Sequence, residues 1–165
     1  MTQLHATAIA IEGQGVLIRG PSNSGKSDLA LRLIDDGAQL VADDRVNIAC
    51  VENYLNISAP DNLKGLIEVR GLGVVNIGAV ENAALKLIID LKPGAAVDRL
   101  PVSNEHILDG VALSILELGP FAHSTPPHTL LTLRIHEGNA TLGELCPNRR
   151  TSFRPRFSPA RLVPV

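Results

Sequence analysis

The segment Gly20-Pro21-Ser22-Asn23-Ser24-Gly25-Lys26-Ser27 constrains this chain more than any other part of the sequence. It matches, without a gap, the spacing G-x-x-x-x-G-K-S of a phosphate-binding loop, or P-loop. An apolar run from Val16 to Ile18 precedes it, and apolar residues at helical spacing follow as far as about Asp35. A strand, this loop and a helix together aim backbone N–H groups and the positive end of the helix dipole at a phosphate. The sequence therefore predicts a nucleotide site.

Three residues of the P-loop have distinct expected roles. Gly25 permits close approach of the backbone to the phosphates. Lys26 places a positive charge on the β- and γ-phosphates, and the Ser27 hydroxyl is a ligand for Mg²⁺. The alternative is a glycine turn with an exposed lysine, which the flanking strand and helix do not favour. The predicted cofactors are ATP and Mg²⁺.

Runs of strand length outnumber helical patterns along the chain. Strands are predicted over Leu4 to Ile11 and Ala38 to Val41, with a helix from Lys26 to about Asp35 that ends near Gly37. Further apolar runs of strand length are Val46 to Val51, Leu66 to Val69, Val74 to Ile77, Leu85 to Leu91 and Val111 to Leu118. Pro126-Pro127 begins a second predicted helix. The expected class is an α/β P-loop domain with a mixed sheet.

Length and composition exclude several classes of protein. With 165 residues the chain has the size of one domain. A net charge of −2 argues against general binding to nucleic acid or membrane surfaces, and only 2% of residues are aromatic, too few for a single-strand nucleic-acid platform. No apolar run reaches the ~18 residues of a membrane span. The first residues lack the pattern of a signal peptide, which predicts a cytoplasmic protein.

The cysteines and histidines do not suggest a zinc site. Cys50 and Cys146 are too few for a disulfide scaffold and are expected to be buried or partly buried thiols. Four histidines show no metal-ligand spacing with cysteines or acids: His106, His123, His128 and His136. His5 lies in a predicted strand among apolar neighbours, where a structural role is the more common one.

The last twenty residues differ from the rest of the chain. Residues 146–165 contain four prolines and little periodicity, and their arginines are Arg149, Arg150, Arg154, Arg156 and Arg161. They read either as a poorly ordered tail or as a basic strap that contacts a partner or a neighbouring subunit. The predicted division is a catalytic domain over 1–145 and a tail over 146–165.

Two further groups of residues carry candidate chemistry. Asp43 and Asp44 follow a predicted strand that should lie beside the P-loop strand, so one acid could hold Mg²⁺ and the other could accept a proton. A solvated turn is the alternative. Glu68 and Arg70 are two residues apart in a predicted strand, so they share a face and suit a metal ligand plus a phosphate clamp. A surface ion pair is the alternative there.

Three segments together resemble the catalytic domain of HPr kinase/phosphorylase: His5-Ala6, Gly20 to Val46, and Ile67 to Gly73. The likeness covers roughly Leu4 to Asp90. Members of this bacterial family phosphorylate a serine of the phosphocarrier protein HPr and can remove the phosphate with inorganic phosphate. The resemblance implies a fold related to phosphoenolpyruvate carboxykinase, HPr as the partner and a hexameric homo-oligomer.

The resemblance also assigns roles to matching positions. The P-loop would hold the nucleotide phosphates, and Ser27 and Glu68 would be ligands of Mg²⁺. Asp43 would be the base toward the acceptor serine and would return the proton in phosphorolysis. The residues that would support this base or steady the phosphates are Asp44, His5 and Arg70.

The chain departs from the family pattern in three respects. It resembles a short form without the N-terminal domain of longer members, and Asn23 stands where the P-loop usually has glycine. The family's downstream basic segment with proline and glycine has no clear match beyond a fragment at Leu100 to Asn104, so kinase activity is better supported than phosphorylase activity. A regulatory module that senses ATP without transfer and a small-molecule kinase are the alternative functions.

Overall fold

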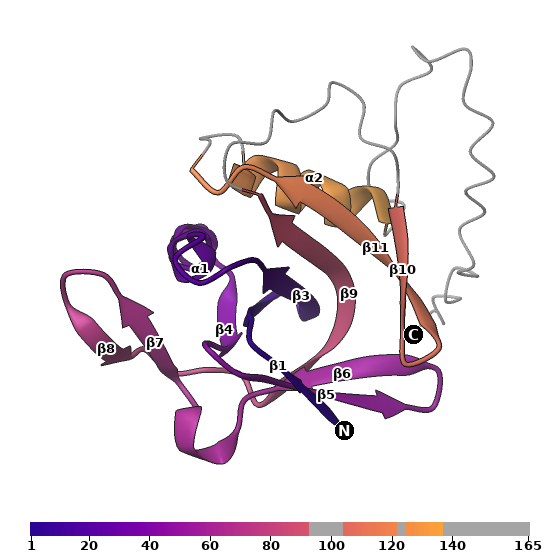
Figure 1. Cartoon of the computed structure of the whole chain (residues 1–165), viewed down its shortest axis with the longest axis horizontal. Helices are drawn as coiled ribbons and strands as arrows, with labels where there is room; N and C mark the ends of the chain where they lie inside the picture. Colours follow the sequence, from indigo (N-terminus) through magenta and orange to yellow (C-terminus); the bar gives the residue numbers. More distant parts are fainter. Residues whose placement is uncertain (93–103, 122–124, 137–165) are drawn as a thin grey trace, which may run out of the picture.

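A mixed sheet and two helices make up the fold of the computed structural model, which describes residues 1–92, 104–121 and 125–136 (Figure 1). The strands are β1 (Thr2–Leu4), β2 (Thr7–Ile11), β3 (Gln14–Arg19), β4 (Gln39–Ala42), β5 (Val46–Val51), β6 (Tyr54–Ser58), β7 (Leu66–Val69), β8 (Gly73–Asn76), β9 (Asn82–Leu91), β10 (Asn104–Leu108) and β11 (Val111–Leu118). The helices are α1 (Lys26–Asp35) and α2 (Thr125–His136), with a short 3₁₀ turn η1 (Asp61–Leu63).

The long strand β9 organises the sheet. One of its edges pairs in parallel with β3, the strand that leads into the P-loop. Its other edge pairs first with β6, antiparallel, and then with β11, parallel. Beyond β3 the sheet continues through β2 to β4, and beyond β6 it continues through β5 to β1. Strands β7 and β8 form a separate hairpin beside α1 (Figure 1).

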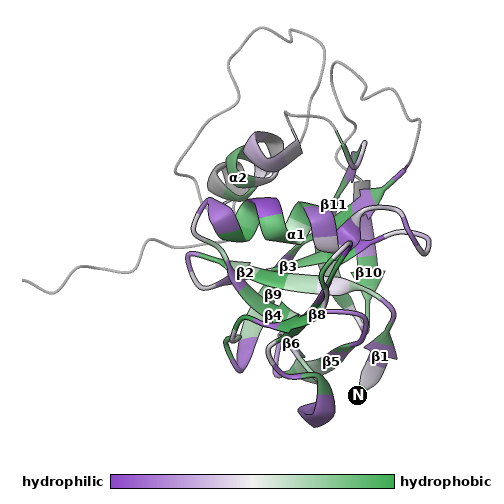
Figure 2. Ribbon diagram, turned by 90° about the vertical axis from the view of Figure 1, so that its left-hand side faces the viewer, coloured by the Kyte–Doolittle hydropathy of each residue, from purple (hydrophilic) through white to green (hydrophobic). Residues whose placement is uncertain are grey.

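Both faces of the sheet are apolar. The central strands carry apolar residues at consecutive positions, and successive side chains point to opposite sides of the sheet. In β3, Val16 and Ile18 join the cluster that packs against α1 and α2, whereas Leu17 joins the cluster on the other face. Helix α1 covers its face with a stripe that includes Leu29 and Leu33, as the sequence predicted. Figure 2 shows this helix with apolar and polar residues alternating around its surface. These two clusters fix the ends of the strands relative to one another.

Helix α1 ends as its sequence predicts. The N–H of Gly37 donates to the carbonyl of Ile34 at 3.0 Å, and the N–H of Ala38 donates to the carbonyl of Leu33 at 2.9 Å. This pair of bonds closes the last turn, with Gly37 in the left-handed region at φ 104°. The chain is thereby turned directly into β4, which ends next to the P-loop.

Several predicted elements need correction. The single strand expected over Leu4 to Ile11 is two strands, because the chain bends at His5-Ala6: β1 pairs with β5, whereas β2 pairs with β3 and β4. The strand before Asp43 does not lie beside the P-loop strand, since β2 lies between them. Strands β6 and β10 were not predicted. Cys50 is exposed rather than buried, because it lies near the outer end of β5.

The remaining sequence predictions fall partly outside the described residues. The arginine-rich tail over 146–165, with Cys146, and most of the fragment from Leu100 to Asn104 are among these. The domain boundary at residue 145 therefore stays a prediction. Within the described ranges, no helix has the length and apolar character needed to cross a membrane.

Candidate active site

The sheet topology brings three strand ends to one place. Strand β2 runs antiparallel to both β3 and β4, so its first residues lie beside the last residues of these two strands. Thr7 at the start of β2 is opposite Ile18 of β3, and Ala8 is opposite Ala42 of β4. The P-loop after β3 and the acids after β4 therefore meet at the same edge, although their strands are not neighbours.

The P-loop encloses the first residue of α1. The Lys26 ammonium donates to the carbonyls of Gly20 at 3.2 Å and Pro21 at 3.0 Å, so the loop curls around it. Gly25, immediately before the helix, has φ 89°, a left-handed conformation that favours glycine. A cavity of about 470 Å³ opens in front of the loop and is lined by Ser22 to Asp28. Of the eight predicted loop residues, six line this cavity, and Gly20 and Pro21 support them from behind.

The backbone conformation of Asn23 accounts for its presence in the P-loop. Its φ is 63°, in the left-handed region, which asparagine tolerates better than most residues other than glycine. Its side-chain oxygen also accepts a hydrogen bond from an Arg70 nitrogen at 3.3 Å. The departure from the usual glycine is therefore compatible with the loop geometry.

Replacing Asn23 with alanine is expected to lower the free energy of unfolding by about 1 kcal/mol, because alanine is strained in the left-handed region. Asn23→Gly is the matched control, and its stability should stay close to that of the wild type. Chemical denaturation of the three proteins measures the difference. Equal stability of the alanine and glycine variants would contradict the conformational explanation.

Lys26 is almost completely buried, with 7% of its surface exposed. Burial lowers the pKa of its ammonium below the ordinary lysine value of 10.5, and the nearby carboxylates of Asp43 and Asp44 oppose this shift without cancelling it. In the free protein, the nearby carboxylates therefore offset only part of the cost of burying the Lys26 ammonium. A bound anion at this position would offset more of it.

Asp43 is the most tightly held acid at the site, and it is 5% exposed. One of its carboxylate oxygens accepts hydrogen bonds from the hydroxyls of Thr7 at 2.6 Å and Ser27 at 3.0 Å. The other accepts from the backbone N–H of Glu68 at 3.0 Å. All these groups donate to Asp43, so they fix the orientation of its carboxylate.

Asp44 and His5 form a second, more exposed pair. His5 Nδ1 lies 3.0 Å from the Asp44 carbonyl oxygen and 3.1 Å from its carboxylate. The Nε2 atom lies 3.4 Å from the Lys26 ammonium, an arrangement that suits a proton on Nδ1. The bend that ends β1 early is what turns His5 toward these groups. The sequence predicts His5 within a strand, whereas it lies at the bend after β1, and its role stays a prediction.

Glu68 and Arg70 both line the cavity, but only Glu68 lies in a strand. Strand β7 ends at Val69, so Arg70 belongs to the turn of the hairpin and the expected shared strand face is wrong. Arg70 instead reaches across to Asn23 of the P-loop. Within the described residues, Glu68 and Arg70 form no ion pair with each other. The hairpin thus contributes a carboxylate and a guanidinium to the lining of the cavity.

The oxygen atoms at the site suit a complex of magnesium and a nucleotide. The buried hydroxyl of Ser24 has no hydrogen-bond partner among the described residues, although buried polar groups are normally paired. The Ser27 hydroxyl and the carboxylates of Asp43 and Glu68 offer the oxygen ligands that Mg²⁺ prefers. No group of three His, Cys, Asp or Glu side chains in the described residues forms a ready-made metal cluster. Magnesium at kinase sites needs only one or two carboxylates plus phosphate oxygens.

Two residues of the site could not be predicted from spacing. Thr7 follows the bend at His5-Ala6, and its hydroxyl reaches Asp43 only because β2 lies between β3 and β4. Phe121 comes from the segment after β11, almost one hundred positions beyond the P-loop, and lines the same cavity. No local pattern in the sequence connects either residue with Asp43 or Lys26.

The sequence profile of the HPr Serine kinase C-terminal domain matches residues 1–107, which include every acid and loop residue of the site. The chain belongs to this family. A solved structure described as the Hpr(Ser) kinase/phosphatase from Coxiella burnetii superposes with a TM-score of 0.74 at 29% sequence identity. The match covers 84% of this chain and 98% of that chain. The predicted α/β class with a mixed sheet is confirmed.

Two relatives named HPr kinase/phosphorylase show a similar degree of likeness. The protein from Clostridium acetobutylicum is 39% identical over 116 residues, and that from Geobacillus sp. (strain WCH70) is 40% identical over 117 residues. Each alignment covers 64% of this chain and 38% of the relative. The chain thus spans less than two fifths of the length of these relatives.

Proposed function

We propose that this chain is an ATP- and Mg²⁺-dependent protein kinase that phosphorylates a serine of an HPr-like phosphocarrier protein. The observation that carries the proposal is the buried Asp43 carboxylate, hydrogen-bonded to Ser27 at the start of α1 and close to Lys26. A site that only sensed a nucleotide would have little use for a fixed carboxylate beside the phosphates. Family membership and the names of the relatives support HPr as the acceptor.

The residues divide the work of phosphoryl transfer among them. The P-loop N–H groups and Lys26 hold the phosphates, and Arg70 steadies them from the hairpin. Ser27 and Glu68 would hold Mg²⁺, which would supply positive charge to the nucleotide phosphates. Asp43 takes the proton of the acceptor hydroxyl while the hydroxyl oxygen bonds to the γ-phosphorus, and the bond to the departing ADP breaks. Asp44 and His5 support Asp43 indirectly, because His5 lies between the Asp44 carboxylate and the Lys26 ammonium.

The hairpin of β7 and β8 favours a protein acceptor over a small molecule. Leu72 and Val74 on this hairpin are 79% and 69% exposed, next to the Glu68 and Arg70 positions that line the cavity. Large apolar side chains exposed together beside a site are typical of surfaces that contact another protein. Assembly as a hexamer and a location in the cytoplasm, where ATP is available, are parts of the same proposal.

The experiment that tests the function is transfer of labelled γ-phosphate from ATP with Mg²⁺ to purified HPr. Label is expected on a serine of HPr, and HPr with this serine replaced by alanine is the matched control. Label on both HPr proteins would contradict serine specificity. Measurable ATP binding without labelled HPr would instead favour a nucleotide sensor or a small-molecule kinase.

The lowered pKa of Lys26 predicts a pH dependence of ATP binding. Bound phosphates favour the ammonium form, so binding raises this pKa and takes up a proton when the free side chain is partly neutral. Affinity should therefore be full at pH values below the pKa of the free protein and decrease as the pH rises through it, before 10.5 is reached. Calorimetry in two buffers of different ionisation enthalpy measures the proton uptake. Constant affinity and no uptake over this range would contradict the prediction.

A further inference from the structure

The segment Gly119–Phe121, which follows β11, lies against the junction between the P-loop and α1. A Cβ atom built on Gly25 would lie 3.1 Å from Phe121 Cε1 and 3.1 Å from Pro120 Cβ. The aromatic ring therefore touches the backbone at the point where the helix begins. Phe121 is nevertheless 66% exposed, and it lines the same cavity as the P-loop and the acids.

The backbone beneath this ring is anchored on both helices. The Arg32 guanidinium of α1 donates to the carbonyl of Pro120, and Arg32 also pairs with Asp28 at 3.1 Å. The hydroxyl of Thr125, the first residue of α2, donates to the carbonyl of Gly119 at 2.7 Å. Because these contacts hold the main chain of the segment, the ring has a defined place while much of its surface stays uncovered.

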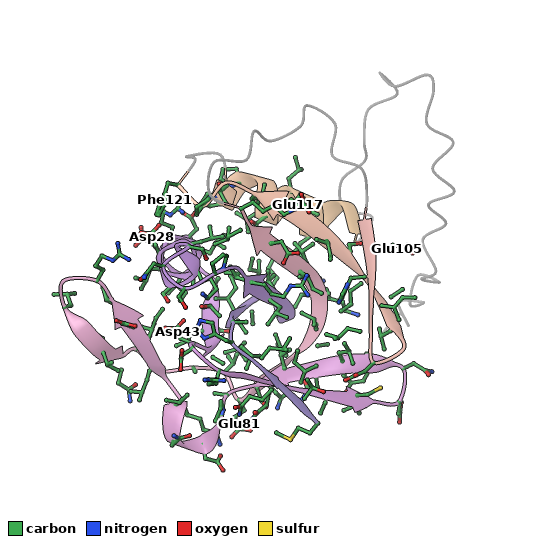
Figure 3. The ribbon with its side chains drawn as sticks, viewed as in Figure 1. Asp28, Asp43, Glu81, Glu105, Glu117 and Phe121 are labelled. Atoms are coloured by element: carbon green, nitrogen blue, oxygen red, sulfur yellow. The ribbon has the colours of Figure 1, made fainter. Side chains whose placement is uncertain are left out.

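The ring of Phe121 and the carboxylate of Asp43 lie on opposite sides of the start of α1. Figure 3 shows Phe121 near Asp28 on one side of α1 and Asp43 on the other. The reacting γ-phosphate must lie on the side of Asp43, which would take the proton of the acceptor. A triphosphate that crosses the start of α1 from there directs its α-phosphate, and the nucleoside attached to it, toward Phe121.

We propose that Phe121 is the platform on which the nucleobase of the bound nucleotide stacks. This inference rests on the proposed function, since it requires a nucleotide in the P-loop. An exposed aromatic face offers a base both apolar contact and stacking, and it tolerates any base because every base has a π-face. The other aromatic residue of the described part of the chain, Tyr54, lies on β6 and does not line this cavity.

The test compares ATP with inorganic tripolyphosphate, which has the phosphates but no base. Calorimetry with Phe121→Ala is expected to show ATP affinity reduced about tenfold, and tripolyphosphate affinity changed by less than about twofold. Tyr54→Ala is the matched control, with both affinities unchanged. Tripolyphosphate binding also reports that each variant still folds its P-loop.

A second variant supplies a spectroscopic reading. The chain contains no tryptophan, so Phe121→Trp introduces a single indole at the proposed platform. ATP is expected to quench its fluorescence strongly, and tripolyphosphate at saturation much less. A Tyr54→Trp variant should respond to neither ligand.

The possible outcomes separate the two proposals. If the wild type binds neither ATP nor tripolyphosphate, the nucleotide function itself fails. If the wild type binds ATP and Phe121→Ala binds it equally well, or loses both ligands to the same extent, the stacking inference is overturned and the function stands. Unchanged ATP affinity with a raised KM for HPr would assign the ring to the protein acceptor and overturn the inference as well.

Discussion

Replacing Asp43 with asparagine is expected to reduce phosphoryl transfer to HPr by about 10²- to 10⁴-fold, the usual contribution of a positioned general base. ATP affinity should stay within a few-fold of the wild type, because the base acts on the acceptor hydroxyl and the variant keeps every residue of the P-loop. Single-turnover transfer of labelled phosphate and calorimetric titration with ATP measure the two quantities separately.

The amide that Asp43→Asn introduces would still accept hydrogen bonds at its oxygen, but its nitrogen would be a donor. At least one of the three groups that donate to Asp43, namely the hydroxyls of Thr7 and Ser27 and the N–H of Glu68, would lose its acceptor. This costs about 1–3 kcal/mol of stability, so the variant must be shown to be folded at the assay temperature.

Asp44→Asn is the matched control for Asp43→Asn. Asp44 is exposed, and its carboxylate contacts His5 and Arg45 at the rim of the site. We expect the effect of this change on transfer to be much smaller than that of Asp43→Asn. Transfer at a near-normal rate in folded Asp43→Asn protein would show that Asp43 is not the base. A larger loss in Asp44→Asn would move the base to Asp44.

Replacing Lys26 with alanine is expected to weaken ATP binding about 10²-fold, because hydrogen bonds from a cation to charged oxygens contribute about 1.5–3 kcal/mol. The same change should weaken tripolyphosphate binding to a similar degree, since the ammonium contacts phosphates and not the base. Lys64→Ala, which removes an exposed lysine paired with Asp61, is the matched control and should leave both affinities unchanged.

Loss of stability should not explain the effect of Lys26→Ala. Burial lowers the pKa of Lys26, so the folded protein favours the charged side chain less than the unfolded chain does. The resulting loss of folding stability is complete at pH values below the pKa that Lys26 has in the folded protein. It disappears as the pH rises toward the pKa of lysine in the unfolded chain. Removing the ammonium at neutral pH relieves it too, although the carbonyls of Gly20 and Pro21 lose a donor. Unchanged ATP affinity in the folded variant would contradict the assignment of the P-loop.

Much of the site could be predicted because its signals are local in the sequence. The P-loop, the apolar stripe of α1 and the turn at Gly37 each depend on residues within one or two turns of one another. The position of Asp43 near the P-loop could also be predicted, since a short helix and a turn return the chain to the loop. The prediction that the strand before Asp43 pairs with the P-loop strand was wrong, because strand order depends on contacts between distant residues.

The local sequence determined that a phosphate loop would lie between a strand and a helix, with two acids a short distance beyond. Periodicity and spacing act over a few residues, and they are sufficient for such elements. Only the tertiary structure decided that β2 lies between β3 and β4, so that Thr7 holds Asp43, and that Phe121 covers Gly25. These contacts depend on the strand order of the sheet. That order is selected by the packing of side chains on both buried faces, and these side chains come from residues far apart in the chain.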